Sequence, residues 1–136
     1  DMNVKDAREI LGEKFIIGAT ANTLDDVMAF SPVDVDYIGL GPYKFTTTKE
    51  NLSPIIELES YANIVKVAAN SKREIPIVAI GGIEYDDIDR VMSSGVDGVA
   101  VSGALINADD TQQATRQMID KLNEILNVRL AERGLI

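Results

Sequence analysis

Three threonines and a lysine stand together in GPYKFTTTKE, residues 41–50, directly after the apolar run VDYIGL. Hydroxyl groups and an ammonium group held at the end of a buried strand can bind an anion such as phosphate. The candidate anion-binding residues are Thr46, Thr47, Thr48 and Lys49. The alternative is a polar surface loop without a ligand. Lys44 is a second cation in the same loop, and composition does not say which lysine points inward.

Small or hydroxylated residues also end the other apolar runs, as in GATANT, AIGGIE and AVSGAL. Small residues let backbone amides approach a ligand closely, and the helix start that follows favours an anion. The candidates at these ends are Thr20, Gly82 and Ser102. Two alternatives stay open, since a Gly-Gly pair can simply make a tight turn and the Thr20 hydroxyl can simply bond to backbone.

Carboxylates gather in EYDDID at residues 84–89 and in NADDTQQ at residues 107–113. A cluster of carboxylates can bind a metal ion. Acidic residues in the first turn of a helix are also favoured by the helix dipole. We interpret both stretches as helix starts.

The composition excludes several kinds of chemistry. The chain has 136 residues, a formal net charge of −9, no cysteine and no histidine. Such an acidic chain is a poor candidate for nucleic-acid binding, which needs clustered Lys and Arg. Disulfides, thiolate and imidazole metal sites and Ser-His-Asp triads are excluded. No apolar run approaches the roughly 18 residues of a membrane span, and we expect a cytoplasmic protein.

The elements that position these residues follow from four continuous apolar runs. The runs are FIIGATA (15–21), VDYIGLG (35–41), IPIVAIGG (75–82) and VDGVAVSGA (96–104). Continuous runs are typical of parallel strands buried on both faces. A segment with helical spacing follows each run, and one more precedes the first. The order α-(βα)×4 predicts an α/β fold with parallel strands.

Four strands are half of an eight-stranded barrel, and VDYIGLGP (35–42) echoes VDGVAVSG (96–103) as repeated βα units would. We expect residues 1–136 to be a single domain that supplies roughly the last four βα units of a (βα)8 TIM barrel. The N-terminal units are then absent from this chain, which begins at Asp1. Open parallel edges favour association, so a homo-oligomer is one expectation. A complete four-stranded flavodoxin-like layer is the alternative.

The segments IIGATANT, VDYIGLGPYKFTTTK, IPIVAIGGI and DGVAVSGAL, in this order and spacing, resemble the thiamin phosphate synthase family. The resemblance covers nearly the whole chain, and its specific part is the Thr-x-Thr-Lys after Gly-Pro. It implies a transferase that joins hydroxymethylpyrimidine pyrophosphate to thiazole phosphate and releases pyrophosphate. It also implies a stabilised pyrimidine cation, which needs neutralisation of the leaving pyrophosphate rather than a general base.

The resemblance also implies roles for single residues. The thiazole phosphate would be bound by Thr46, Thr47, Thr48, Gly82, Val101 and Ser102. Lys49 and Thr20 would contact the pyrophosphate of the pyrimidine substrate and act in catalysis. Asp1 would bind a Mg²⁺ cofactor, and Lys44 would be left as a solvated lysine.

This chain departs from the family pattern at three places. Thr20 stands where Ser is usual, Asn22 where His is usual, and Lys44-Phe45 where an apolar residue and Pro are usual. The remaining pyrophosphate and metal motifs would lie upstream, so we expect this chain alone to be inactive. The alternative functions are a thiazole tautomerase or another phosphate-binding barrel. The tautomerases use a histidine, which this chain lacks.

Overall fold

The computed structural model describes residues 2–45, 53–72 and 74–136. It has the expected order of elements, with one short helix that the sequence patterns did not predict. The elements are α1 (Val4–Leu11), β1 (Gly18–Ala21), α2 (Leu24–Ala29), β2 (Tyr37–Leu40), α3 (Leu58–Asn70), β3 (Ile77–Ile80), α4 (Ile88–Ser93), β4 (Gly98–Ala100), α5 (Gly103–Ile106) and α6 (Thr111–Glu132). A single 3-10 turn, Tyr85–Asp87, leads into α4. The unpredicted helix is α5.

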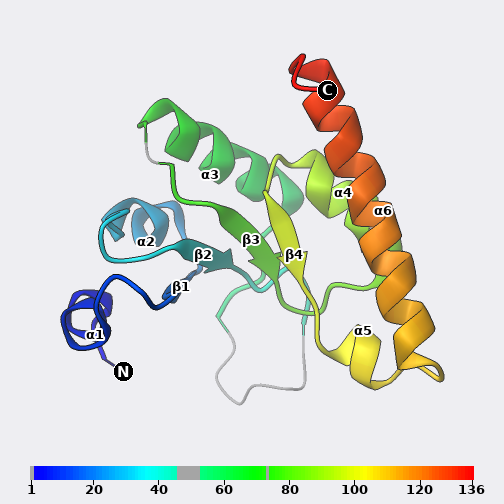
Figure 1. The fold of residues 1–136 in the computed structure, drawn as a ribbon, viewed down its shortest axis with the longest axis horizontal. Coiled ribbons are helices and arrows are strands. Elements are labelled where there is room, and N and C mark those ends of the chain that lie inside the picture. The colour runs from blue at the N-terminus through cyan, green and yellow to red at the C-terminus, as the bar shows by residue number, and fades with distance from the viewer. Residues whose placement is uncertain (1, 46–52, 73) are drawn as a thin grey trace.

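The four strands form one parallel sheet in the order β1-β2-β3-β4, so neighbours in sequence are neighbours in space. In Figure 1 the helices form an arc around the outside of this sheet, from α1 and α2 on one side through α3 to α4 and α6 on the other. The parallel α/β architecture predicted from the four runs is therefore confirmed.

The expectation that these strands are buried on both faces is wrong for the described part of the chain. In β1, Ala19 and Ala21 are buried whereas Gly18 and Thr20 are exposed. The register continues both rows across the sheet. The covered row is Ala21, Leu40, Ala79 and Val99, and the open row is Thr20, Gly39, Val78 and Gly98.

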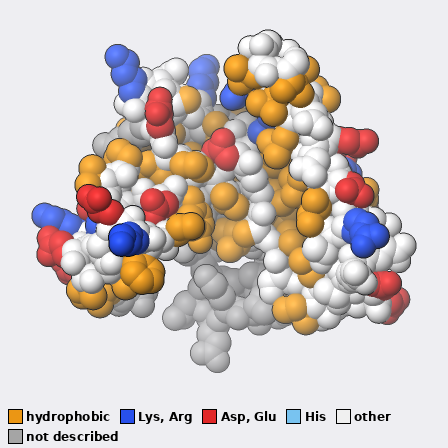
Figure 2. Space-filling model, in the orientation of Figure 1, with side chains coloured by type: hydrophobic (Ala, Val, Ile, Leu, Met, Phe, Trp, Pro, Cys, Tyr) orange, Lys and Arg blue, Asp and Glu red, His pale blue; other side chains and the backbone are white. Residues whose placement is uncertain are grey.

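The reason for the one-sided burial is that the helices cover only one face. The core between sheet and helices includes fully buried Ile38, Leu40, Ile88, Val91 and Met92. Figure 2 shows further hydrophobic side chains gathered over the middle of the molecule. The open row consists of two glycines, a threonine and a valine, so this face of the sheet carries little side-chain volume at that level.

Local contacts explain where the helices begin and end. Thr23 caps α2 in a reciprocal capping box with Asp26, and Asp110 caps α6 by accepting a hydrogen bond from the N–H of Gln113. Gly95, with a φ of 97°, ends the α4 region in a conformation that favours glycine. No helix among the described residues is long and apolar enough to cross a bilayer.

The two echoing segments have the same local structure. The Asp36 carboxylate accepts a hydrogen bond from the N–H of Ile17, and the N–H of Asp36 donates to the Ile17 carbonyl. Asp97 makes the same pair of bonds with Ile77. Each aspartate therefore joins the start of its own strand to the preceding strand, which explains why Val-Asp recurs in the sequence.

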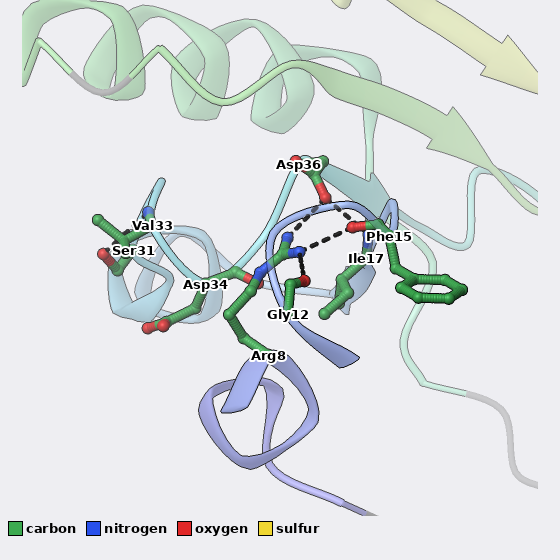
Figure 3. Close-up of polar contacts among 8 residues, drawn as sticks. All are labelled: Arg8, Gly12, Phe15, Ile17, Ser31, Val33, Asp34 and Asp36. Atoms are coloured by element: carbon green, nitrogen blue, oxygen red, sulfur yellow. Dashed lines mark hydrogen bonds and ion pairs between the residues drawn. The ribbon is translucent and has the colours of Figure 1, made fainter. Parts of the chain in front are cut away.

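Arg8 fastens α1 to the amino-terminal end of the sheet. Its guanidinium donates to the carbonyls of Gly12, Phe15 and Asp34, and lies 2.7 Å from the Asp36 carboxylate. Figure 3 shows these groups converging on the guanidinium. The cluster therefore lies at the amino ends of the strands, away from their carboxyl ends.

Candidate active site

A cleft of about 950 Å³ lies at the carboxyl ends of the strands. Its walls include four of the residues singled out in the sequence, namely Thr20, Gly82, Val101 and Ser102. These residues come from the ends of β1, β3 and β4, so the parallel sheet brings together side chains far apart in the chain. The structure therefore brings these four positions together at one cleft.

Five other predicted site residues lie outside the described residues. They are Asp1, Thr46, Thr47, Thr48 and Lys49. On either side of the 46–52 segment, Phe45 and Ser53 both line the cleft.

The loop after β2 is bound to the turn after β3 by backbone hydrogen bonds. The N–H of Tyr43 donates to the Ile80 carbonyl over 3.0 Å, and the N–H of Lys44 donates to the Gly81 carbonyl over 2.9 Å. At the end of β2 itself, the buried hydroxyl of Tyr61 donates to the carbonyl of Leu40. The two loops thus form one continuous wall of the cleft.

Gly81 and Gly82 both need to be glycine in this wall. Their φ angles of +100° and +67° lie in the left-handed region that side chains disfavour. A Cβ on Gly82 would also come within 2.9 Å of the Lys44 Cβ. The Gly-Gly pair does make a tight turn, as the alternative interpretation held, and this turn lies in the cleft wall.

Two backbone donors in this part of the cleft have no partner among the described residues. Among the described residues, no acceptor pairs with the N–H of Gly82 or with the N–H of Ser102. Thr20 is exposed, and its hydroxyl makes no hydrogen bond within the described part of the chain. The alternative in which Thr20 bonds to backbone therefore finds no support there. An anion is the kind of ligand that would satisfy such donors.

Lys44 is exposed, with 45% of its side chain accessible, and it is also paired, which the sequence interpretation did not expect. Its ammonium lies 2.7 Å from a carboxylate oxygen of Asp87, whose side chain is only 9% exposed. The two residues are 43 positions apart in the chain, and only the folded arrangement brings them together. The sequence interpretation missed this partner because it considered the loop alone, whereas Asp87 stands in the next βα connection.

The pair is ionised at neutral pH. Burial alone would raise the pKa of Asp87, but hydrogen bonds from Lys44 and from the Glu84 N–H bring this pKa below the ordinary 3.8. The hydrogen bond to Asp87 in turn raises the pKa of Lys44 above 10.5. The Lys44 ammonium is therefore charged, and the Asp87 carboxylate beside it balances that charge.

Asn22 is a second residue that the sequence interpretation left without a role. Its side-chain amide donates to the Gly41 carbonyl over 2.9 Å and to the Pro54 carbonyl over 2.8 Å. It therefore joins β1 to both sides of the loop that follows β2. The signal that pointed to it was its departure from the family pattern at that position.

The acidic stretches act as helix starts, as predicted. Glu84 and Asp87 form a reciprocal capping box before α4, and Asp110 caps α6. No group of three or more carboxylates within residues 2–45, 53–72 and 74–136 is placed to bind a metal ion.

The comparisons with known proteins agree on one family. The family model of thiamine monophosphate synthase matches residues 1–105. The thiamine-phosphate synthase of Bacteroides thetaiotaomicron is 46% identical over 120 residues, which cover 88% of this chain and 57% of that protein. The thiamine-phosphate synthase of Flavobacterium psychrophilum is 46% identical over 122 residues, covering 90% and 59%.

The fold agrees with these sequence matches. A solved structure of thiamine phosphate pyrophosphorylase from Pyrococcus furiosus matches with a TM-score of 0.78 and 35% identity, over 93% of this chain and 57% of that one. The chain thus spans 57–59% of the length of these relatives. Since the matches cover most of this chain at high identity, it belongs to the thiamine monophosphate synthase family.

Proposed function

We propose that the protein carrying this chain is a thiamine phosphate synthase, a transferase that couples hydroxymethylpyrimidine pyrophosphate with thiazole phosphate. The observation that carries the proposal is the meeting of Thr20, Gly82 and Ser102 in one cleft of a chain of this family. All three were singled out because they could bind a phosphate. Their convergence supports a substrate site at the strand ends.

The two phosphorylated groups are divided between two sets of residues. The thiazole phosphate is bound by Gly82, Val101 and Ser102 together with Thr46, Thr47 and Thr48. The available N–H groups of Gly82 and Ser102 support this part. Lys49 and Thr20 contact the pyrophosphate of the pyrimidine substrate, and the exposed Thr20 at the end of β1 lies on the same cleft.

The proposed reaction requires stabilisation of the negative charge that develops on the leaving pyrophosphate. When the C–O bond between the pyrimidine methylene and the pyrophosphate breaks, the bonding electrons leave with the pyrophosphate and a stabilised cation remains. The thiazole nitrogen then donates its lone pair to the methylene carbon. Such a step is favoured by a cation beside the leaving group and needs no histidine base. The chain has no histidine.

Magnesium as a cofactor is a further part of the proposal. Its only ligand in this chain would be Asp1, which lies outside the described residues. Within the described residues, no group of three or more carboxylates is placed to bind a metal ion.

We also propose that the four βα units belong to a (βα)8 barrel. The strand order β1-β2-β3-β4 supports this, because all neighbours are parallel and sequential and the order never reverses. A flavodoxin-like layer has such a reversal. The open row of the sheet would face the barrel interior. Association with copies of the chain and a cytoplasmic location are expectations of the same proposal.

The test is an assay of the purified full-length protein with both substrates. The proposal predicts pyrophosphate and thiamine phosphate in equal amounts, and no product when either substrate is omitted. A tautomerase or an isomerase would release no pyrophosphate. Absence of pyrophosphate release from a folded protein would therefore overturn the proposal in favour of one of those functions.

A further inference from the structure

Lys44 holds the loop after β3 at two points, on either side of Gly82. Its N–H donates to the carbonyl of Gly81, and its ammonium lies 2.7 Å from the Asp87 carboxylate. Between these two points lie Gly82 and the residues that lead to α4. The turn that presents Gly82 to the cleft is therefore held by backbone on one side and by an ion pair on the other.

The Asp87 end of this contact is firmly placed. The same carboxylate oxygen that meets Lys44 accepts a hydrogen bond from the N–H of Glu84 over 3.0 Å. The Asp87 side chain is 9% exposed, so its charge depends on these partners. Asp87 in this way closes the turn 84–87 and gives the Lys44 ammonium a fixed point to bind.

The Lys44–Asp87 ion pair differs in its location from the other ion pairs of the described residues. Arg8–Asp36 lies at the amino end of the sheet, and Lys121–Asp89 joins α6 to α4. Lys44–Asp87 alone among these pairs joins two of the loops that form the cleft. Lys44 itself lines the cleft, and its Cβ is the atom that a side chain on Gly82 would strike.

We propose that Lys44 and Asp87 are positioning residues whose ion pair keeps the N–H of Gly82 in place for the phosphate of thiazole phosphate. This inference rests on the proposed function and adds to it a pair of residues to which neither the sequence motifs nor the family resemblance gives a role. In this proposal Lys44 affects phosphate binding by holding the turn that contains Gly82, and Asp87 affects it by holding Lys44.

The competing role for Lys44 is direct contact with the phosphate. The two roles give opposite results for Asp87→Asn. If Lys44 binds the phosphate itself, removing the Asp87 charge frees the ammonium, and binding is kept or improved. If the pair positions Gly82, loss of either partner loosens the same turn, and the two substitutions have similar effects.

The test is steady-state kinetics of the full-length protein with Lys44→Ala, Asp87→Asn, the double variant and Lys44→Arg. We expect KM for thiazole phosphate to rise about tenfold in each single variant, as for loss of a charged hydrogen bond. The double variant should be no worse than either single one. Lys44→Arg keeps the ion pair and should stay within about twofold of wild type. KM for the pyrimidine substrate should not change.

Asp36→Asn is the matched control, because it removes an ion pair at the far end of the sheet. It should lower the melting temperature without changing KM. If Lys44→Ala and Asp87→Asn behave like this control, the pair is merely structural and the inference is overturned. Unchanged KM in Asp87→Asn alone, with a raised KM in Lys44→Ala, overturns it in favour of direct contact. A wild type that releases no pyrophosphate contradicts the proposed function instead.

Discussion

Gly82 packs so closely against Lys44 that a Cβ atom on the glycine would lie 2.9 Å from the Lys44 Cβ. The φ of +67° at Gly82 adds a second reason for glycine at this position. This wall of the cleft thus depends on the absence of a side chain at Gly82 and on the position of the Lys44 side chain.

Gly82→Ala should therefore lower the free energy of unfolding by about 2–4 kcal/mol, from the left-handed conformation and the crowding together. Urea denaturation measures this. Gly134→Ala is the matched control, since Gly134 also has a positive φ but a Cβ there would meet no described atom within 4 Å. It should cost about 1–2 kcal/mol at most. Equal losses in both variants would contradict the close packing.

Arg8→Ala should destabilise the protein by about 2–4 kcal/mol, because it removes a largely buried guanidinium, leaves its carbonyl partners without that donor and takes from Asp36 its ion-pair partner. Urea denaturation is again the measurement. Arg116→Ala removes an exposed arginine of α6 with no partner among the described residues, and should change stability by less than about 0.5 kcal/mol. A loss in Arg8→Ala no greater than in Arg116→Ala would contradict the role given to the Arg8 cluster.

Asn22→Ala should reduce stability by about 1–2 kcal/mol, since two backbone carbonyls lose their side-chain donor. Because these carbonyls belong to Gly41 and Pro54, KM for thiazole phosphate should rise as well. Thermal unfolding and kinetics check the two effects. Asn63→Ala, at an exposed position of α3, is the control and should change neither. If Asn22→Ala changed neither stability nor KM, the two hydrogen bonds of Asn22 would have no importance for the loop.

The stability difference between wild type and Asp87→Asn should depend on pH. The pKa of Asp87 is lowered in the folded protein, so its contribution is present above the ordinary value of 3.8 and is lost as the pH falls through the lower, folded value. The pKa of Lys44 is raised, so the Lys44 part of this contribution is lost as the pH rises beyond 10.5.

Urea midpoints at several pH values from about 3 to 8 follow this difference across the range in which the Asp87 carboxyl changes its charge. Wild type should exceed Asp87→Asn by a constant amount at neutral pH, and the gap should narrow below pH 3.8. A gap that stays constant to the lowest pH, or widens as the pH falls, would contradict an ionised Asp87 paired with Lys44.

The order of the elements could be predicted from the sequence because each strand is a run of apolar residues and each long helix has a repeating apolar face. The helix α5 was missed because its four residues are too few to show a period. Burial on both faces was wrong because a continuous run such as FIIGATA cannot show which side of a strand the helices cover. Only alternate residues of β1 lie under them.

The residues of the candidate site likewise fall into those that could be predicted from the sequence and those that could not. Thr20, Gly82 and Ser102 could be found because parallel strands bring their carboxyl ends to one edge. The Lys44–Asp87 pair could not, since it joins residues from two connections and depends on the close approach of Gly82. Asn22 was visible only as a residue unlike the family pattern, and its two hydrogen bonds reach loops that follow later in the chain.

Pyrophosphate release by Lys49→Ala tests the central proposal most directly, with Lys14→Ala as a control at an exposed position outside the cleft. The wild-type protein should form pyrophosphate and thiamine phosphate in equal amounts from the two substrates, and Lys14→Ala should do the same. Lys49→Ala should keep its melting temperature but lose about 100-fold or more in kcat, as for loss of a charge that stabilises the leaving group. Wild-type turnover in Lys49→Ala, or no pyrophosphate from the wild type, would contradict the account.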